Sequence, residues 1–482
     1  MTTASPATAP SWASALDDFA RALAEKHAIP GLAVAVASGG RTVHELCLGY
    51  RDTEQQLPVT PDTIFGIGSV SKSFTALAIL QLQDAGALSV HDAVSKHLPT
   101  FRLPGEHGAR YTPEITLHHL LTHTSGIPPE PVLFRARVAA VRADPDLLWM
   151  EVPDHVRDAV ARLEPITTYA ALLDAIAAHG FAPLGPPGRC FSYSNEGYAL
   201  LAATVERVSG LSFPRYVQER IAAPLELTRT GCRTPDFPLT PPVAQIYSRG
   251  TRDGTKGVFA APHWWGLGDI FGNGNLISTT RDLLRYLELF LGEGEVDGRR
   301  FVSREAIHAM TSPHVAMHTS GFYGYGLMVY PGYHGVTLIG HAGGNKGISA
   351  DAVFVPERGI AAAGLANLAG VPIARVTRGV INALLDLPLE TKPETFPGYE
   401  LASERLAEYA GLYRSEDGHA LTVSVDGDAL LVQGPVGPAQ RARPYGEDAF
   451  VVESADAPAR FLRDEAGAVW ALADVRVVRK VS

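Results

Sequence analysis

The hydrophobic and polar positions of the larger, N-terminal part predict strands at both of its ends and helices between them. Apolar residues recur at helical spacing over 12–26, which predicts an amphipathic helix. Apolar runs at 32–37 and 43–50, joined by a glycine turn, predict two antiparallel strands. Further strands are predicted at 323–330 and within 352–366. Because these strands are far apart in the sequence, the two ends must meet to build one antiparallel sheet.

The pattern changes after a proline-rich segment at 386–398, which is typical of a linker. Apolar and polar residues then alternate over 421–425, and the pair Asp426-Gly427 indicates a hairpin turn. Short strands continue at regular spacing, which predicts a small antiparallel barrel or sandwich. We see no catalytic cluster in this part of the sequence.

Together the two patterns predict an α+β protein of two domains. An antiparallel sheet flanked by helices, with an all-helical lobe, is expected over 1–390. A linker is expected over 391–399, and a small antiparallel β-barrel domain over 400–482. Residues 128–166 open with prolines and continue with a helical pattern. They are expected to form an insertion or lid, or else a pair of surface helices.

Composition excludes several classes of function. The chain has 482 residues, of which 46% are hydrophobic and 19% charged, as in ordinary globular proteins. Its net charge of -10 comes from interspersed charges of both signs, so no nucleic-acid-binding surface is expected. Cys47, Cys190 and Cys232 are too few and too far apart for a disulfide framework. We recognise neither a secretory signal nor a membrane span, and therefore expect a cytoplasmic protein without a membrane partner.

One short motif carries candidate chemistry. Ser69 and Lys72 are three residues apart at the start of an apolar helix that is expected to end near residue 85. Residues at this spacing lie on one helix face, which puts the amine beside the hydroxyl. Serine is a weak nucleophile until a base takes its proton, and Lys72 can do so only if burial or a nearby cation lowers its pKa. Taken alone, the motif also fits an ordinary helix cap.

Two further motifs are the candidates for partners of this serine. Tyr193-Ser194-Asn195 precedes a predicted helix, and His341-Ala342-Gly343 follows a predicted strand. Taken alone, the tyrosine also fits a packed core residue, and the histidine a hydrogen-bonded strand residue.

A histidine pair raises the question of a metal. His119 and His123 are one helical turn apart, which is the spacing of metal ligands, but no third ligand follows in a matching pattern. We therefore expect no metal and no cofactor, and a helix end whose histidines are tied to backbone groups.

In their order and spacing, the three motifs make the chain similar to the serine β-lactamase and penicillin-binding-protein superfamily. The resemblance is strongest to the branch that holds class C β-lactamases, D-Ala-D-Ala carboxypeptidases, D-aminopeptidases and related esterases. Supporting segments lie at 120–126, 274–282 and 323–326, and the similarity covers about residues 12–385. The C-terminal part looks like the lipocalin-like domain attached to some D-aminopeptidase-like members.

The resemblance implies an acyl-enzyme on Ser69. Lys72 and Tyr193 would share the proton transfers, with Tyr193 as base or relay and then as acid to the leaving group. Asn195 would hydrogen-bond Lys72 or a substrate amide. The backbone N–H groups of Ser69 and Gly344 would form the oxyanion hole.

The strand motif departs from the family pattern. Penicillin-recognising members usually carry Lys-Thr-Gly where this chain has His341-Ala342-Gly343. That lysine faces the carboxylate of a β-lactam or a C-terminal D-alanine, whereas histidine is shorter and mostly neutral at pH 7. We expect His341 to take part in catalysis, but carboxylate recognition to be weaker and a β-lactam to be a less suitable substrate. Ala342 and Gly343 are expected to bind substrate, since small residues let its backbone approach.

The expected function is that of a serine hydrolase or acyltransferase for a small peptide, amide or ester, in the manner of D-aminopeptidases and carboxypeptidases. Carboxylesterase, β-lactamase and penicillin-binding-protein-type thioesterase or peptide cyclase are alternatives that use the same chemistry. A sensor or binding protein that accepts an acyl group is the alternative of another class. The leaving group, the acyl acceptor, the stereochemistry and the oligomeric state stay open, a homo-oligomer included.

Overall fold

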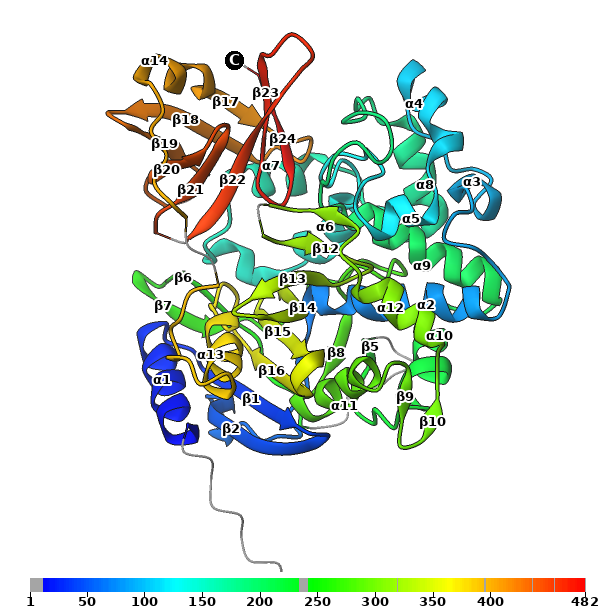
Figure 1. Ribbon diagram of the computed structural model, residues 1–482, viewed down its shortest axis with the longest axis vertical. Helices are drawn as coiled ribbons and strands as arrows, with labels where there is room; N and C mark the ends of the chain where they lie inside the picture. Colours follow the sequence, from blue (N-terminus) through cyan, green and yellow to red (C-terminus); the bar gives the residue numbers. More distant parts are fainter. Residues whose placement is uncertain are drawn as a thin grey trace, which may run out of the picture.

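The computed structural model describes residues 12–233, 242–318, 320–393, 396–435, 437–454 and 456–481. Figure 1 shows a larger body, which holds the N-terminal sheet and its helices, and a barrel coloured orange to red beside it. The α+β class and the C-terminal antiparallel barrel are confirmed. The exact boundaries at 390 and 400 stay a prediction.

The central sheet joins the two ends of the larger part. Its strand β1 pairs antiparallel with β16, so that Leu32 lies opposite Ala366. The expectation that distant strands meet in one sheet is therefore confirmed. Within the described residues the strands are, in order across the sheet, β11 (Val315–Ala316), β12 (Phe322–Tyr323), β13 (Met328–Tyr333), β14 (Val336–Asn345), β15 (Ile348–Val355), β16 (Ile360–Ala366), β1 (Gly31–Ser38), β2 (Arg41–Asp52) and β3 (Leu57–Pro58).

The prediction of a single strand at 323–330 is wrong, because a turn divides it. Strand β12 ends at Tyr323 and β13 begins at Met328. Between them Gly326 has a φ of 72°, a conformation that favours glycine. A Cβ atom on Gly326 would lie 2.7 Å from the carbonyl oxygen of Lys72. The turn is thus packed against the helix that carries Lys72.

Side chains of β1 alternate between two faces of the sheet, and helices cover both faces (Figure 1). Val34 and Val36 belong to the core formed with α1 and α13. Ala33 and Ala35 belong to the larger core, which includes α11 and the helical lobe. These covering helices are α1 (Ala13–Lys26), α11 (Thr280–Leu291) and α13 (Ala374–Leu384).

Helix α2 lies at the centre of the helical lobe. Of its 14 residues, 11 are buried, including Lys72, so it has no polar face. Helix α9 packs against it and is capped by Ser194, whose hydroxyl accepts the N–H of Gly197. None of the helices in the described ranges combines the length and apolar composition needed to cross a membrane.

Helices α2 and α9 are the longest of the lobe, and shorter helices and strands complete the lobe and its edges. The helices are η1 (Gly68–Val70), α2 (Ser71–Asp84), α3 (Val94–His97), α4 (Gly105–Tyr111), η2 (Thr112–Glu114), α5 (Leu117–Leu121), α6 (Phe134–Arg142), η3 (Pro145–Leu148), α7 (Asp154–Arg162), α8 (Tyr169–Ala178), α9 (Asn195–Ser209), α10 (Phe213–Tyr216), η4 (Val217–Ala222), α12 (Arg304–Thr311) and η5 (Pro356–Arg358). The strands are β4 (Phe65–Gly66), β5 (Gly231–Cys232), β6 (Tyr247–Arg252), β7 (Thr255–Ala260), β8 (Leu276–Ser278), β9 (Glu295–Val296) and β10 (Arg299–Arg300).

The barrel is closed by pairing of its first strand, β17, with its last, β24. Aromatic side chains fill it, and the ring centres of Tyr409 and Phe461 are 4.6 Å apart. It consists of β17 (Gly411–Arg414), β18 (Ala420–Asp426), β19 (Ala429–Gln433), β20 (Gln440–Gly446), β21 (Ala449–Val452), β22 (Ala457–Arg463), β23 (Val469–Ala473) and β24 (Val477–Lys480), preceded by α14 (Ser403–Leu406) and η6 (Ala407–Tyr409).

The turn between β23 and β24 reaches from the barrel into the helical lobe. The N–H of Tyr193 donates to the carbonyl oxygen of Val475 at 2.9 Å. The N–H of Val477 in turn donates to the hydroxyl of Ser192 at 3.2 Å. The barrel is therefore hydrogen-bonded to the segment that carries the candidate tyrosine.

Replacing Phe74 by alanine is expected to lower the free energy of unfolding of the larger part by about 3–5 kcal/mol. Phe74 is fully buried in α2, and its ring stacks on that of Tyr286 with the centres 3.8 Å apart. Urea unfolding followed by circular dichroism measures the loss. The control Phe74→Leu keeps most of the buried volume and should cost markedly less, so equal losses would contradict the packing.

Candidate active site

Ser69 and Lys72 lie side by side where η1 passes into α2. Ser69 is in the 3₁₀ turn, one element before the α-helix itself. The Nζ atom of Lys72 is 3.2 Å from the Oγ atom of Ser69 and 2.8 Å from Oδ1 of Asn195. It is also 2.5 Å from the carbonyl oxygen of Asn273. The structure thus brings the first motif together with the amide of the second.

The surroundings of Lys72 favour a neutral amine. Burial lowers the pKa of Lys72 well below its ordinary value. A neutral amine has two N–H groups and one lone pair. When the two N–H groups donate to the oxygens of Asn195 and Asn273, the lone pair can accept a hydrogen bond from the hydroxyl of Ser69. The arrangement can therefore accept the proton of Ser69.

The phenol of Tyr193 completes the group around Ser69. Burial raises the pKa of Tyr193 well above its ordinary value, and a hydrogen bond with Ser69 counters the rise only in part. The Nζ atom of Lys72 lies 4.8 Å from the centre of the Tyr193 ring. At neutral pH the phenol therefore keeps its proton and can act as a donor or relay.

The two histidines of the pair support different parts of the backbone, His123 the segment of Tyr193 and His119 the start of α5. The ring of His123 lies 4.3 Å from that of Tyr193, centre to centre, and its Nδ1 accepts the N–H of Ser194 at 3.0 Å. Burial lowers the pKa of His123 well below its ordinary value, so the ring is neutral. His119 accepts the N–H of Thr116 at the start of α5. Both histidines are thus tied to backbone groups.

The glycines of β14 pack directly against η1. A Cβ on Gly343 would lie 2.0 Å from the carbonyl oxygen of Ile67 and 3.0 Å from the nitrogen of Ser69. A Cβ on Gly68 would lie 2.6 Å from the nitrogen of Gly344. Only residues without side chains allow two backbones to come so close. The backbone nitrogens of Ser69 and Gly344 thus lie on two segments that are packed together, and their role as an oxyanion hole stays a prediction.

Ser69 opens on a small cavity of about 160 Å³. Of the predicted site residues, Ser69, Tyr193, Asn195 and Gly344 line it, and Lys72 is buried beside Ser69. The complete lining is polar or glycine: Ser69, Glu130, Arg137, Tyr193, Asn195, Asn273, Gly274, Asn275, Gly344, Asn345 and Arg476.

His341 lies near this group but outside the cavity lining. Its ring is 6.1 Å from that of Tyr193, its Nε2 is 3.1 Å from the hydroxyl of Tyr323, and its Nδ1 is 2.5 Å from the carbonyl oxygen of Ala342. Burial lowers the pKa of His341 to about 3, so the imidazole is neutral with both nitrogens in use. Its catalytic role stays a prediction, as do the substrate-binding roles of Ala342 and Gly343.

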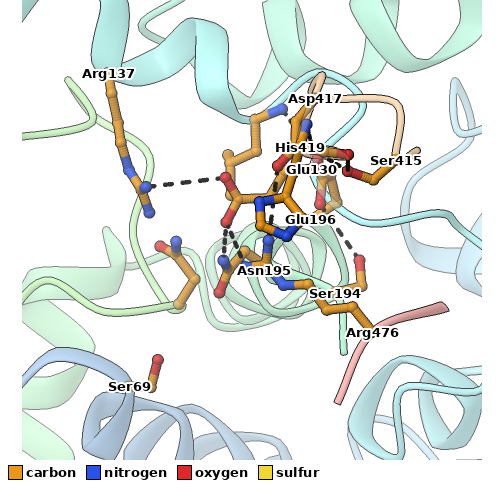
Figure 2. Close-up of polar contacts among 12 residues, drawn as sticks. Ser69, Glu130, Arg137, Ser194, Asn195, Glu196, Ser415, Asp417, His419 and Arg476 are labelled. Carbon is orange, nitrogen blue, oxygen red and sulfur yellow. Dashed lines mark hydrogen bonds and ion pairs between the residues drawn. The ribbon is translucent and has the colours of Figure 1, made fainter. Parts of the chain in front are cut away.

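Sequence patterns give no sign of three charged residues that line the cavity, Glu130, Arg137 and Arg476 (Figure 2). Glu130 and Arg137 come from the 128–166 segment, and Arg476 from the turn between β23 and β24. The Oε1 atom of Glu130 accepts from Nη2 of Arg476 at 3.0 Å and from Nδ2 of Asn195. The C-terminal part, in whose sequence we see no catalytic cluster, thus contributes Arg476 to the cavity lining. Only the fold brings these residues together.

A second buried carboxylate, Glu196, fastens the 128–166 segment to α9. It accepts the backbone N–H groups of Val132 and Leu133 and the hydroxyl of Ser194. Burial and the negative charge of Glu130 raise the pKa of Glu196 to about 7. The segment is thus anchored at the helix that carries Asn195.

Within the described residues, one group of side chains has the geometry of a metal site: Asp144, Asp146 and His263. The ammonium group of Lys346 lies 2.5 Å from a carboxylate oxygen of Asp144, and the indole N–H of Trp265 donates to the same carboxylate. A positive side chain thus already occupies the position of a cation. The group is an ion pair that holds the end of β14 to the 128–166 segment.

Comparisons of the sequence with known proteins agree with this geometry. Residues 16–385 match the sequence profile of one family, described as Beta-lactamase. The chain is 31% identical over 408 residues to penicillin-binding protein 4 of Amycolatopsis lactamdurans, a match that covers 82% of the chain and 96% of that relative. A penicillin-binding protein of Bacillus subtilis (strain 168) is 27% identical, over 68% of the chain and 65% of its own length.

Solved structures give the same result. The octameric penicillin-binding protein homologue from Pyrococcus abyssi is 28% identical with a TM-score of 0.65, and the match covers 96% of this chain and 99% of that one. A D-stereospecific amidohydrolase from Streptomyces sp. is 26% identical with a TM-score of 0.58, over 76% of this chain and 97% of that one. The first of these similarities extends over the barrel as well as the larger part.

Gly343→Ala is expected to slow labelling by a fluorophosphonate, a probe of activated serines, by roughly 10²-fold. The added Cβ would lie 2.0 Å from the carbonyl oxygen of Ile67 and would push β14 away from η1. The rate of labelling measures the effect, with circular dichroism to verify the fold. Gly332→Ala on β13 is the matched control, because its Cβ would meet no atom within 4 Å. Equal rates for both variants would contradict the close packing.

Proposed function

We propose a function from the premise that the chain belongs to the β-lactamase and penicillin-binding-protein superfamily. The proposed function is that of a serine hydrolase or acyltransferase for small, peptide-like amides or esters. The observation that carries the proposal is the fully buried amine of Lys72, 3.2 Å from the hydroxyl of Ser69. A buried amine of lowered pKa beside a serine is an arrangement that activates the hydroxyl as a nucleophile.

Acylation would begin with attack by the Oγ atom of Ser69 on the substrate carbonyl, while Lys72 takes the hydroxyl proton. The backbone N–H groups of Ser69 and Gly344 would stabilise the negative charge that develops on the carbonyl oxygen. Tyr193 would give its proton to the leaving group as the C–N or C–O bond breaks, and would regain one from Lys72. The result is an ester between Ser69 and the acyl part of the substrate.

Deacylation would use the same groups in reverse order. Water or an amine would lose a proton to the pair of Lys72 and Tyr193 as it attacks the ester, and Ser69 would regain its proton. The pKa directions favour Lys72 over Tyr193 as the base in the free protein, because burial lowers the first and raises the second. Asn195 would hold the amine in place throughout, through its bond of 2.8 Å.

Among enzymes of this chemistry we favour an amidase or peptidase that accepts a D-residue. Similarity to the D-stereospecific amidohydrolase supports this choice. The small polar cavity suits a short peptide-like substrate. The neutral, hydrogen-bonded His341 agrees with the expectation that a β-lactam is less suitable. Similarity to the octameric homologue supports a homo-oligomer as part of the proposal.

The alternative functions share the acylation of Ser69 with the proposed one. A carboxylesterase or β-lactamase differs in the leaving group, and a penicillin-binding-protein-type thioesterase or peptide cyclase differs in the acyl acceptor as well. A sensor would need Ser69 but not fast deacylation.

The purified protein is expected to release p-nitroaniline from D-amino-acid p-nitroanilides, faster than from the L-forms, and Ser69→Ala should abolish both this activity and fluorophosphonate labelling. Ser424→Ala, at an exposed position of the barrel, should change neither. Turnover of p-nitrophenyl esters or nitrocefin without turnover of the amides would favour an alternative enzyme. If the wild-type protein is not labelled, only a binding function is left.

The pH dependence of kcat/KM should report the proton on Lys72. Lys72 must be neutral to act, so activity rises with pH through its pKa. Glu130 raises this pKa and Arg476 lowers it. Glu130→Gln should therefore move the acid limb to lower pH, and Arg476→Gln to higher pH, each by roughly one unit.

The profile is measured on an uncharged ester, so that substrate charge does not contribute. Arg441→Gln, which removes a partly exposed barrel arginine with its own carboxylate partners, should leave the profile unchanged. Shifts of the same sign for the Glu130 and Arg476 variants would contradict the electrostatic account.

A further inference from the structure

Arg137 lines the cavity with unused hydrogen-bond donors. Its Nη1 atom is 3.9 Å from Oε2 of Glu130, beyond hydrogen-bonding distance. Its Nε atom is buried and, within the described residues, has no hydrogen-bond partner. An arginine carries five N–H donors in a planar fork, and leaving a buried donor unpaired is unfavourable. Figure 2 shows the side chain directed from α6 toward Glu130.

Arg476 differs from Arg137 because its charge is shared between two carboxylates. It donates to Glu130 at 3.0 Å and faces Asp417, which is not in the cavity lining, at 3.7 Å. The charged residues of the lining are therefore two guanidinium groups and one carboxylate. A ligand that enters this cavity meets an excess of positive charge at Arg137.

Glu130 is not available to bind a substrate ammonium group. Its Oε1 atom already accepts from Asn195 and Arg476, and its Oε2 faces Arg137. Burial would raise the pKa of Glu130, but Arg137 and Arg476 outweigh it and lower the pKa to about 2. The carboxylate thus stays ionised and is matched by two arginines. His341 adds no charge, because its imidazole is neutral.

The position of Arg476 indicates which side of the substrate lies here. Arg476 and Tyr193 both line the cavity. Burial raises the pKa of the Tyr193 phenol and the positive charge of Arg476 counters this rise in part, so this end of the cavity is on the Tyr193 side. In the proposed mechanism Tyr193 protonates the leaving group. The leaving group therefore occupies this end. By microscopic reversibility, the acyl acceptor occupies the same end.

We propose that Arg137, supported by Arg476, forms an anion subsite for the α-carboxylate of the amino acid on the leaving-group side of the scissile bond. Planar arginine and carboxylate groups pair through two parallel hydrogen bonds, which would employ the free donors of Arg137. The cavity of about 160 Å³ is small, which suits a single residue on this side of the bond. The inference rests on the proposed function and specifies its substrate.

Direct binding tests the subsite without turnover. Ser69→Ala protein is titrated calorimetrically with N-acetyl-D-alanyl-D-alanine and with its C-terminal amide. The free acid should bind at least about tenfold more tightly, and Arg137→Gln in the same background should reduce the ratio to within about twofold. Arg137→Lys, which keeps the charge but not the fork, should retain part of the preference. The same titrations with D-alanine and D-alaninamide test separately whether the subsite binds the carboxylate of an amino-acid acceptor.

Arg135→Gln is the matched control. It removes a positive charge from the same helix, where Arg135 donates to the carbonyl oxygen of Glu164 at 2.9 Å, and should leave the preference unchanged. Failure of the acid to bind, equal affinity for acid and amide, or an undiminished preference in Arg137→Gln would overturn the subsite. Turnover of uncharged esters by the wild-type protein, lost in Ser69→Ala, reports the proposed function independently.

Discussion

The site depends on one buried amine. Lys72 is surrounded by oxygens from three separate segments, the hydroxyl of Ser69, the amide of Asn195 and the backbone carbonyl of Asn273. An ammonium group loses its hydration in such a place, so burial disfavours the charged form. Helix α2 is buried on all sides to fill the core of the lobe. The same burial that packs the helix therefore lowers the pKa of the amine that we propose as the base.

The charge of Glu130 imposes a second constraint. Its carboxylate is buried, and an isolated charge in that position would be strongly unfavourable. Arg137 from the same segment and Arg476 from the barrel supply the opposite charge, while Asn195 connects the carboxylate to Lys72. The 128–166 segment, α9 and the barrel are thus held in one arrangement. The candidate active site is a joint product of the larger part and the barrel.

Features with a period or a fixed local spacing could be predicted from the sequence. The apolar run of β1 and the polar alternation of the barrel strands specify their elements, and helix geometry fixes the approach of Ser69 and Lys72. Arg476 and Glu130 meet through contacts between distant loops, which no local pattern encodes. The sequence does not show that His341 lies within β14, and its hydrogen bond to Tyr323 depends on tertiary packing.

The turn between β23 and β24 links the thermal behaviour of the two parts. It holds the backbone of Tyr193 and supplies Arg476, so melting of the barrel alone would release both. The sheet and the barrel have separate cores, which can lose their structure at different temperatures. Heat inactivation would then follow whichever part melts first. The upper working temperature would be set by the weaker core even while the nucleophile stays in place.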